Sequence, residues 1–259
     1  MFIPIDGHLL NAVAFGSGPV DFVAHGGWVG SWELWQDPFM LMQERWRCIS
    51  YDHRGSGAST FPADTITPEA LVDDLFAVLD HFSVEQCVLA GESLGALTCL
   101  QAVLREPQRF AGLVLVDGAP AADRERQSAL VAGSRANFPA TVHAFVEACV
   151  PEADSGHFRN WGRQILLRAD PESAARILEV HYEAGVAPAL ADVRVPTLVL
   201  HGELDHIVPL DIGRYVAASI PGAELVVIPG AGHVPSITRP HAVVDAIEEW
   251  STRAVRSMS

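Results

Sequence analysis

The sequence contains no lysine: all 17 of its basic residues are arginine, and 32 Asp and Glu residues bring the formal net charge to -15. Mechanisms that need an amine are therefore excluded, among them a Walker-type phosphate loop, a kinase-like strand lysine and a Schiff base to pyridoxal phosphate. The sequence contains no run of clustered arginines that would form a local basic patch. We therefore expect neither a nucleic-acid partner nor binding to an anionic membrane surface.

Cysteine and long apolar runs are also scarce. The four cysteines, Cys48, Cys87, Cys99 and Cys149, form no C-x-x-C pair and no zinc-like spacing, and the first two lie in apolar runs where buried free thiols are expected. The N-terminus has no basic leader, and no segment is apolar enough to span a bilayer. These absences predict a soluble cytoplasmic protein. The sequence does not indicate its oligomeric state.

The sequence shows the alternation of short strand-like and longer helix-like segments that is typical of an α/β fold. Short apolar runs alternate with longer amphipathic stretches, which predicts a mostly parallel, doubly wound sheet. The expected strands cover residues 3–5, 12–15, 20–24, 47–51, 86–90, 113–116, 196–200 and 225–228. The expected helices start at Ser31, after Thr67, after Gly95 and near His241.

The alternation stops between residues 119 and 193. This stretch predicts several short amphipathic helices, broken at Gly133, Pro139, Pro151, Gly156, Pro171 and Gly185. A helical insertion between two strands of the sheet is the simplest account. The predicted domain organisation is therefore a core of residues 1–118 and 194–259 carrying an insertion of residues 119–193.

The run Gly91-Glu92-Ser93-Leu94-Gly95 lies between a predicted strand and a predicted helix. A serine in such a tight turn needs small residues two positions before and after it, because the neighbouring backbones crowd there. The turn lifts the hydroxyl clear of the sheet and puts the Leu94 N–H at a helix N-terminus, where anionic charge is favoured. Ser93 is therefore the candidate nucleophile.

A serine nucleophile needs a base and an acid that orients it. His233 follows the last predicted strand in a mobile, Gly-rich loop, and Asp205 follows the strand before it. Both residues thus lie beyond the carboxyl ends of strands, where ligand sites of open α/β sheets gather. We predict a catalytic triad of Ser93, His233 and Asp205.

With these motifs the chain resembles the α/β-hydrolase superfamily over nearly its whole length. His25-Gly26-Gly27-Trp28 is similar to the family's HG loop, and Asp52-His53-Arg54-Gly55-Ser56-Gly57-Ala58-Ser59 to its D-x-R-G-x-G-x-S segment. The resemblance implies an esterase- or lactonase-like serine hydrolase whose residues 119–193 form a helical cap. It also implies an oxyanion hole from the N–H groups of Gly27 and Leu94, with Trp28 as the neighbouring alternative.

Other titratable residues compete for these roles. Glu203 and Asp117 are alternative acids. Asp117 is the more serious alternative, because it follows the expected strand 113–116 and some members of the superfamily place the acid after that strand. Glu92 is interpreted as an ordinary carboxylate at a helix N-terminus. We expect His25 to stabilise its own loop, and His53 and His201 to lie at turn positions.

The substrate is less well defined by the sequence. Trp28, Phe138, Phe145, Phe158 and Trp161 could line an apolar pocket, although packing of the cap onto the core explains each of them equally well. The predicted substrate is a small or medium hydrophobic ester or lactone, with no cofactor and no metal. A cofactor-free, haloperoxidase-like perhydrolase, a carbon–carbon bond hydrolase and a ligand-binding receptor that keeps the triad remain alternatives.

Overall fold

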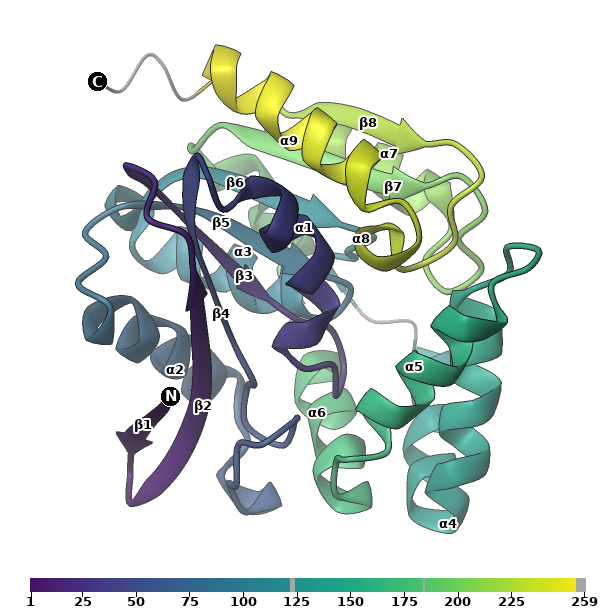
Figure 1. The fold of residues 1–259 in the computed structure, drawn as a ribbon. Coiled ribbons are helices and arrows are strands. Elements are labelled where there is room, and N and C mark those ends of the chain that lie inside the picture. The colour runs from purple at the N-terminus through teal and green to yellow at the C-terminus, as the bar shows by residue number, and fades with distance from the viewer. Residues whose placement is uncertain (122–123, 184, 255–259) are drawn as a thin grey trace.

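The computed structural model describes residues 1–121, 124–183 and 185–254, and its centre is an eight-stranded sheet (Figure 1). The strand order is β1-β2-β4-β3-β5-β6-β7-β8, antiparallel at β1–β2 and β2–β4 and parallel from there on. The predicted doubly wound, mostly parallel sheet is confirmed. The strands are β1 (Phe2–Ile5), β2 (His8–Phe15), β3 (Val20–His25), β4 (Trp46–Tyr51), β5 (Cys87–Glu92), β6 (Phe110–Val116), β7 (Thr197–Gly202) and β8 (Glu224–Ile228).

Helices cover both faces of the sheet, because successive side chains of a strand point to opposite sides. In β3, Val23 joins one apolar core, whereas Phe22 and Ala24 join the other. The first core contains α2 (Pro68–His81), α3 (Gly95–Arg105) and α7 (Leu210–Ser219); the second contains α1 (Gln36–Met42) and α9 (Pro240–Ala254). Shorter elements are η1 (Trp32–Trp35), η2 (Ala63–Thr65), η3 (Pro107–Arg109) and α8 (Pro235–Thr238).

The start of α2 shows why the local sequence forms a helix there. The Thr67 hydroxyl accepts a hydrogen bond from the Ala70 N–H (3.1 Å), which satisfies one of the free donors of the first turn. Pro68 at the first helical position has no N–H that needs an acceptor. The predicted helix after Thr67 is therefore confirmed.

Between β6 and β7 lies the helical insertion, which here means residues 119–193. It contains α4 (Arg124–Cys149), α5 (Gly156–Leu166), α6 (Pro171–Glu183) and η4 (Ala187–Asp192). Figure 1 shows α4, α5 and α6 together beside one end of the sheet. Because Cys149, at the end of α4, and Glu152, which precedes α5, accept hydrogen bonds from the loop that follows β8, the insertion packs against that loop.

The predicted helix break at Gly133 is wrong. Helix α4 continues through Gly133 and is interrupted at Asn137, whose backbone adopts φ -158° and ψ 80°. The physical reason is Pro139, which lacks an N–H and disfavours a helical backbone in the residue before it. Gly133 instead allows the two halves of α4 to approach, since a Cβ there would lie 2.6 Å from Thr141 Oγ1.

Two elements differ from the sequence prediction. Helix α7 is absent from the predicted elements. His201 lies inside β7 rather than at a turn, because β7 continues two residues beyond its predicted end. All four cysteines are buried and free, as expected for Cys48 and Cys87. No helix among the described residues is both long and apolar enough to cross a membrane.

The segment after β4 is braced by a buried ion pair. The Arg54 guanidinium donates from Nε and Nη2 to the Asp74 carboxylate (2.6 and 2.7 Å), and both side chains are almost completely buried. The neighbouring Asp52 accepts hydrogen bonds from the backbone N–H groups of Trp32 and Ala58. Both residues therefore hold loops in place, and neither contacts Ser93.

We expect Arg54→Met to lower the free energy of unfolding by about 3–5 kcal/mol, because it leaves the Asp74 carboxylate buried without its partner. The double variant Arg54→Met/Asp74→Leu removes both charges and should lose much less. Urea unfolding of the two variants and the parent measures the difference. A double variant as unstable as the single one would show that the loss comes from packing and not from the unpaired charge.

Candidate active site

The backbone of Ser93 sits in the left-handed region, with φ +55°, at the sharp turn between β5 and α3. A residue with a side chain rarely adopts this conformation, which costs free energy and persists only where the surroundings enforce it. Here the Ser93 N–H donates to the carbonyl of Val116 in β6 (2.8 Å). The turn therefore holds the hydroxyl at the carboxyl end of the sheet.

Glycines on either side of the serine allow this turn. A Cβ on Gly91 would lie 2.7 Å from Cys99 Sγ, and one on Gly95 would lie 2.4 Å from the carbonyl oxygen of Gly26. The predicted need for small residues at these two positions is thus confirmed. Gly27 is equally close, since a Cβ on it would stand 2.9 Å from Ser93 Cβ, so the loop after β3 packs directly on Ser93.

The three predicted triad residues form a continuous hydrogen-bonded chain. The Ser93 hydroxyl donates to His233 Nε2 (2.7 Å), and His233 Nδ1–H donates to Asp205 Oδ2 (2.8 Å). The Asp205 and His233 side chains are almost completely buried. The loops after β5, β7 and β8 thus bring together residues that are up to 140 positions apart in the sequence.

Asp205 is held as the charged member of the chain. Its Oδ1 accepts from the backbone N–H groups of Ile207 (2.7 Å) and Val208 (2.9 Å). Burial alone would raise the pKa of Asp205, but His233 and these N–H donors outweigh burial and leave the pKa below its ordinary value. Asp205 is therefore ionised at neutral pH and can fix the tautomer and orientation of His233.

The alternative acid Asp117 lies beside Asp205. Among the described residues, no hydrogen bond joins Asp117 to His233. Its Oδ1 accepts from the Gly202 N–H (2.8 Å). Burial, and then the nearby charge of Asp205, raise the pKa of Asp117 well above its ordinary value. Asp117 is thus protonated more readily than its neighbour Asp205, whose pKa is lowered.

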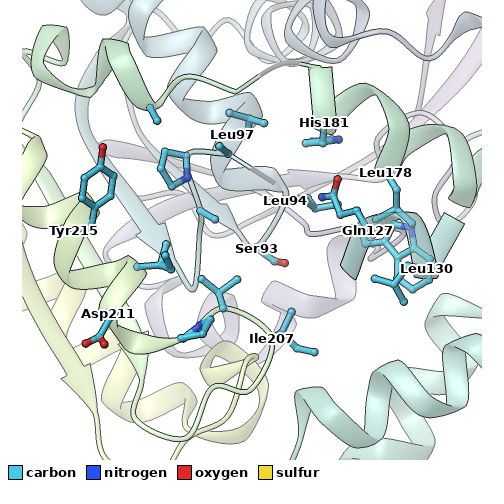
Figure 2. A pocket seen from close by; sticks show the side chains of 18 of the residues that line it. Ser93, Leu94, Leu97, Gln127, Leu130, Leu178, His181, Ile207, Asp211 and Tyr215 are labelled. Atoms are coloured by element: carbon cyan, nitrogen blue, oxygen red, sulfur yellow. The ribbon is translucent and has the colours of Figure 1, made fainter. Parts of the chain in front are cut away.

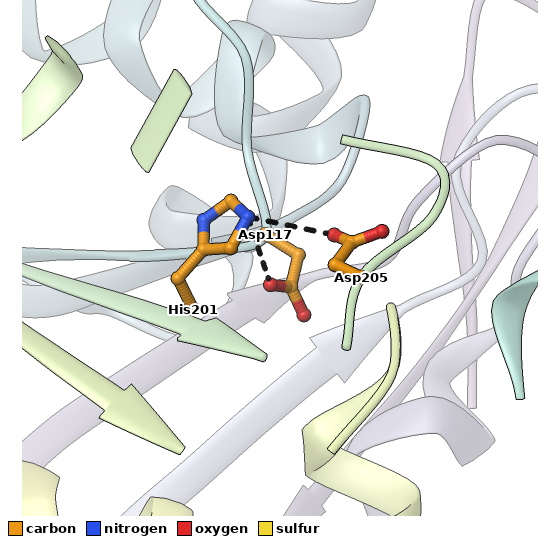
Figure 3. A group of neighbouring side chains, drawn as sticks. All are labelled: Asp117, His201 and Asp205. Carbon is orange, nitrogen blue, oxygen red and sulfur yellow. Dashed lines mark ion pairs between the residues drawn. The ribbon is translucent and has the colours of Figure 1, made fainter. Parts of the chain in front are cut away.

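Asp117, His201 and Asp205 form the buried group with metal-ligand residue types shown in Figure 3. His201 Nε2 lies 3.6 Å from an oxygen of each carboxyl group. That nitrogen donates to the Val208 carbonyl (2.8 Å), so it carries a proton and offers no lone pair to a cation. With Asp205 already bound to His233 and two N–H groups, the cluster fits a proton-bearing network better than a metal site.

The helical insertion contacts the loop that carries His233. The His233 N–H donates to the carbonyl of Cys149 at the end of α4 (2.8 Å), and the Gly232 N–H donates to Glu152 Oε1 (2.9 Å). A Cβ on Gly232 would lie 2.4 Å from the Cys149 carbonyl. The loop that the sequence predicts to be mobile is therefore tethered. No sequence pattern around Glu152 could have indicated this contact.

Glu92 is not the ordinary helix-terminus carboxylate that the sequence suggests. It is 1% exposed, and the Ser236 hydroxyl, itself buried, donates to it with distances of 2.8 and 2.9 Å to the two carboxyl oxygens. Burial raises the pKa of Glu92 to about 8. The contact links the turn that holds Ser93 to the first turn of α8, three residues after His233.

A cavity of about 510 Å³ opens at Ser93 and is lined mostly by apolar side chains. Figure 2 shows it between α7, which contributes Asp211 and Tyr215, and the insertion, which contributes Leu130 and Leu178. A cavity of this size encloses a small or medium molecule. A smaller cavity of about 50 Å³ is also lined by Ser93, together with His233 and residues of the insertion.

The five predicted pocket residues divide into two groups. Trp28 and Phe145 line both cavities, and Phe158 lines the smaller one. Phe138 and Trp161 line neither; Phe138 packs edge-on against Trp28 in the core between insertion and sheet, and Trp161 is partly buried against the same cluster. Both belong to the packing of the insertion, the alternative already weighed for each aromatic residue.

The remaining histidine and acid candidates have structural contacts. His25 is buried and bonded through Nδ1 to the Gly26 carbonyl (2.7 Å), and its ring stacks on His53. Burial lowers the pKa of His25 well below its ordinary value, so it stays neutral. Glu203 accepts from the Gly230 N–H (2.9 Å) and supports the loop before His233 rather than the imidazole.

Comparisons with known proteins show which family the chain is similar to. A model described as the alpha/beta hydrolase family matches residues 22–246. A pimeloyl-(acyl-carrier protein) methyl ester esterase of Edwardsiella ictaluri is 29% identical over 249 residues, covering 91% of this chain and 95% of that protein. A 3-oxoadipate enol-lactonase of Acinetobacter baylyi is 28% identical over 221 residues, covering 83% and 82%. The solved enol-lactonase of Burkholderia xenovorans superposes with a TM-score of 0.89 at 23% identity, covering 98% and 100%, which shows the fold.

The burial of Glu92 predicts a pH dependence of stability. Because the folded state raises the pKa of Glu92 from 4.5 to about 8, the folded chain holds a proton that the unfolded chain has lost between these values. Stability should therefore fall as pH rises through this window, by about 1.4 kcal/mol per pH unit from this group. Glu92→Gln should remove that slope.

The measurement is the free energy of unfolding of the parent and of Glu92→Gln at several pH values between 5 and 8. The difference between the two proteins isolates Glu92, because every other titrating group is common to both. A difference that stays constant across this range would show that Glu92 is ionised in the folded state.

Proposed function

Because the chain belongs to the alpha/beta hydrolase family and is a hydrolase, we propose that it cleaves a small or medium hydrophobic carboxylic ester or lactone through an acyl-enzyme intermediate. The observation that carries this proposal is the hydrogen-bonded chain from Ser93 through His233 to Asp205, of which Ser93 lines an apolar cavity. The catalytic assignment of these three residues belongs to the proposal.

In the proposed reaction Ser93 Oγ attacks the ester carbonyl while His233 Nε2 takes its proton. Asp205 holds the imidazole with Nδ1–H toward itself and stabilises the imidazolium that forms. His233 then protonates the leaving oxygen, and water releases the acyl group by the same proton path in reverse. Every proton in the cycle moves between Ser93, His233, water and substrate.

The negative charge that develops on the carbonyl oxygen needs N–H donors in place before the reaction. We assign this role to the backbone N–H groups of Gly27 and Leu94, with Trp28 as the alternative to Gly27. Support comes from the close packing of Gly27 on Ser93 and from the position of Leu94 at the N-terminus of α3. One such donor is commonly worth about 2.7–4 kcal/mol of transition-state stabilisation.

Residues 119–193 are proposed to form a cap over a core of residues 1–118 and 194–259. In support, residues of α4 and α6 line the large cavity on the side opposite α7. The apolar lining favours a hydrophobic acyl or alcohol group. Similar proteins carry the names methyl ester esterase and enol-lactonase, which is consistent with carboxylic ester chemistry.

Removal of the nucleophile tests the proposal. Ser93→Ala should lower kcat for the hydrolysis of medium-chain esters by roughly five orders of magnitude or more, because no other group in the chain takes over the attack. The parent should react once with a serine-directed fluorophosphonate, and peptide mass spectrometry should place the label on Ser93. The near-ultraviolet circular dichroism and the thermal unfolding of the variant should match those of the parent and exclude misfolding.

Two outcomes would contradict the proposal. Full ester turnover by Ser93→Ala would remove the assigned nucleophile. Labelling of Ser93 without turnover of any ester or lactone would instead favour carbon–carbon cleavage, perhydrolysis or a receptor that keeps the three side chains.

The choice of acid is tested by a pair of amide substitutions. Asp205→Asn should lower kcat by about four orders of magnitude, because the amide cannot hold the imidazole in the required tautomer. Asp117→Asn replaces a carboxyl group whose pKa is raised well above its ordinary value by an amide of the same shape and should cost far less. If Asp117→Asn lost more activity than Asp205→Asn, the two roles would be reversed.

A further inference from the structure

Two cavities of very different size meet at Ser93. The large cavity (about 510 Å³) and the small cavity (about 50 Å³) share three lining residues, Trp28, Ser93 and Phe145. A carbonyl carbon bonded to Ser93 Oγ has two substituents besides its oxygen, and these must leave the serine in different directions. Each cavity therefore offers room for one of the two substituents.

The position of the base decides which substituent lies on which side. His233 lines the small cavity and is absent from the lining of the large one. The oxygen of the departing alcohol must come within hydrogen-bond reach of His233 Nε2 to receive its proton. The alcohol part of an ester therefore lies on the side of the small cavity, and the acyl part extends into the large one.

We propose that the enzyme is selective for esters of short alcohols, with one to about three carbons, joined to a medium-length hydrophobic acyl group. This inference rests on the proposed serine-hydrolase function and goes further by naming the two halves of the substrate. The balanced reaction forms a Ser93 Oγ–acyl bond and breaks the carbonyl–alkoxy bond. The serine proton passes through His233 to the short alcohol, and water then yields the free acid and restores the serine hydroxyl.

The size limit follows from the small cavity itself. A cavity needs about 10–15 Å³ of free volume to hold one water-sized group. The small cavity of about 50 Å³ therefore has room for only a few such groups. Its walls are mainly apolar. They include Val146 and Leu166 from the insertion and Ile237 from α8. A methyl to propyl group fits these walls, whereas a hexyl or benzyl group does not.

Gly162 offers a way to fill the small cavity without disturbing the catalytic residues. It lies in α5 and lines the small cavity, and a Cβ built on it meets only Val146, at 3.6 and 3.8 Å. Gly162→Val therefore adds volume on the alcohol side. Gly156→Val is the matched control, because Gly156 is in the same helix, has nothing within 4 Å of its Cβ and lines neither cavity.

The experiment measures kcat/KM for the methyl, propyl, hexyl and benzyl esters of octanoic acid by titration of the acid released. The parent should hydrolyse the methyl and propyl esters at least about 10-fold faster than the hexyl and benzyl esters, since a few methylene groups that do not fit a pocket are commonly worth 10-fold or more. Gly162→Val should lower the propyl rate by about 10-fold relative to the methyl rate. Gly156→Val should leave the parent ratio unchanged.

A second series separates the two cavities. Ala187 lines only the large cavity, so Ala187→Phe should shift the preferred acyl length of methyl esters downward while the methyl-to-propyl ratio stays at the parent value. Gly162→Val should show the reverse pattern, with the acyl ranking unchanged. Crossed effects of this kind would not follow from a general loss of stability.

Three results would overturn the inference. Equal or faster turnover of the hexyl and benzyl esters would show that the alcohol leaves through the large cavity. An equal loss for all esters in Gly162→Val would mean that the small cavity holds no part of the substrate. Failure to hydrolyse any ester, with Ser93 unlabelled by fluorophosphonate, would instead overturn the proposed function and this inference with it.

Discussion

The left-handed backbone of Ser93 is the constraint on which the rest of the site depends. A non-glycine residue with φ +55° is kept there by contacts around it and not by its own preference. Those contacts exist because Gly91 and Gly95 carry no side chain, so that Cys99 and the carbonyl of Gly26 can come close. The same close approach brings the loop after β3 onto the serine. One strained residue therefore sets both the direction of the hydroxyl and the position of Gly27.

The helical insertion does more than enclose space. Its α4 carbonyl at Cys149 accepts the His233 N–H, and Glu152 accepts the N–H of Gly232. An insertion that moved away from the sheet would break these hydrogen bonds and release the loop that carries His233. The segment that lines the large cavity therefore also holds the imidazole against Ser93, and the shape of the cavity and the geometry of the base are coupled.

The sequence predicts the parts of this molecule that depend on local chemistry. The strand alternation, the capped start of α2 and the glycines beside Ser93 follow from backbone preferences, and the order Ser93, Asp205, His233 places three side chains at one sheet edge. Contacts between distant segments are not accessible in this way. The bond from Ser236 to Glu92 joins residues 144 positions apart, and no spacing rule connects them. The same limit explains why Phe138 and Phe145, similar in sequence context, separate into a packing residue and a cavity residue.

Three buried carboxyl groups surround the imidazole and its serine, yet their surroundings favour a charge on only one. Burial opposes ionisation of all three, so the nearby charge of His233 and the hydrogen-bond donors decide which pKa falls. Asp205 receives two backbone N–H groups and His233, whereas Asp117 receives the Gly202 N–H and Glu92 receives one hydroxyl. The pKa of Asp205 accordingly lies below its ordinary value while those of Asp117 and Glu92 lie above theirs. His233 and the backbone turn after β7 together thus hold the charge on Asp205.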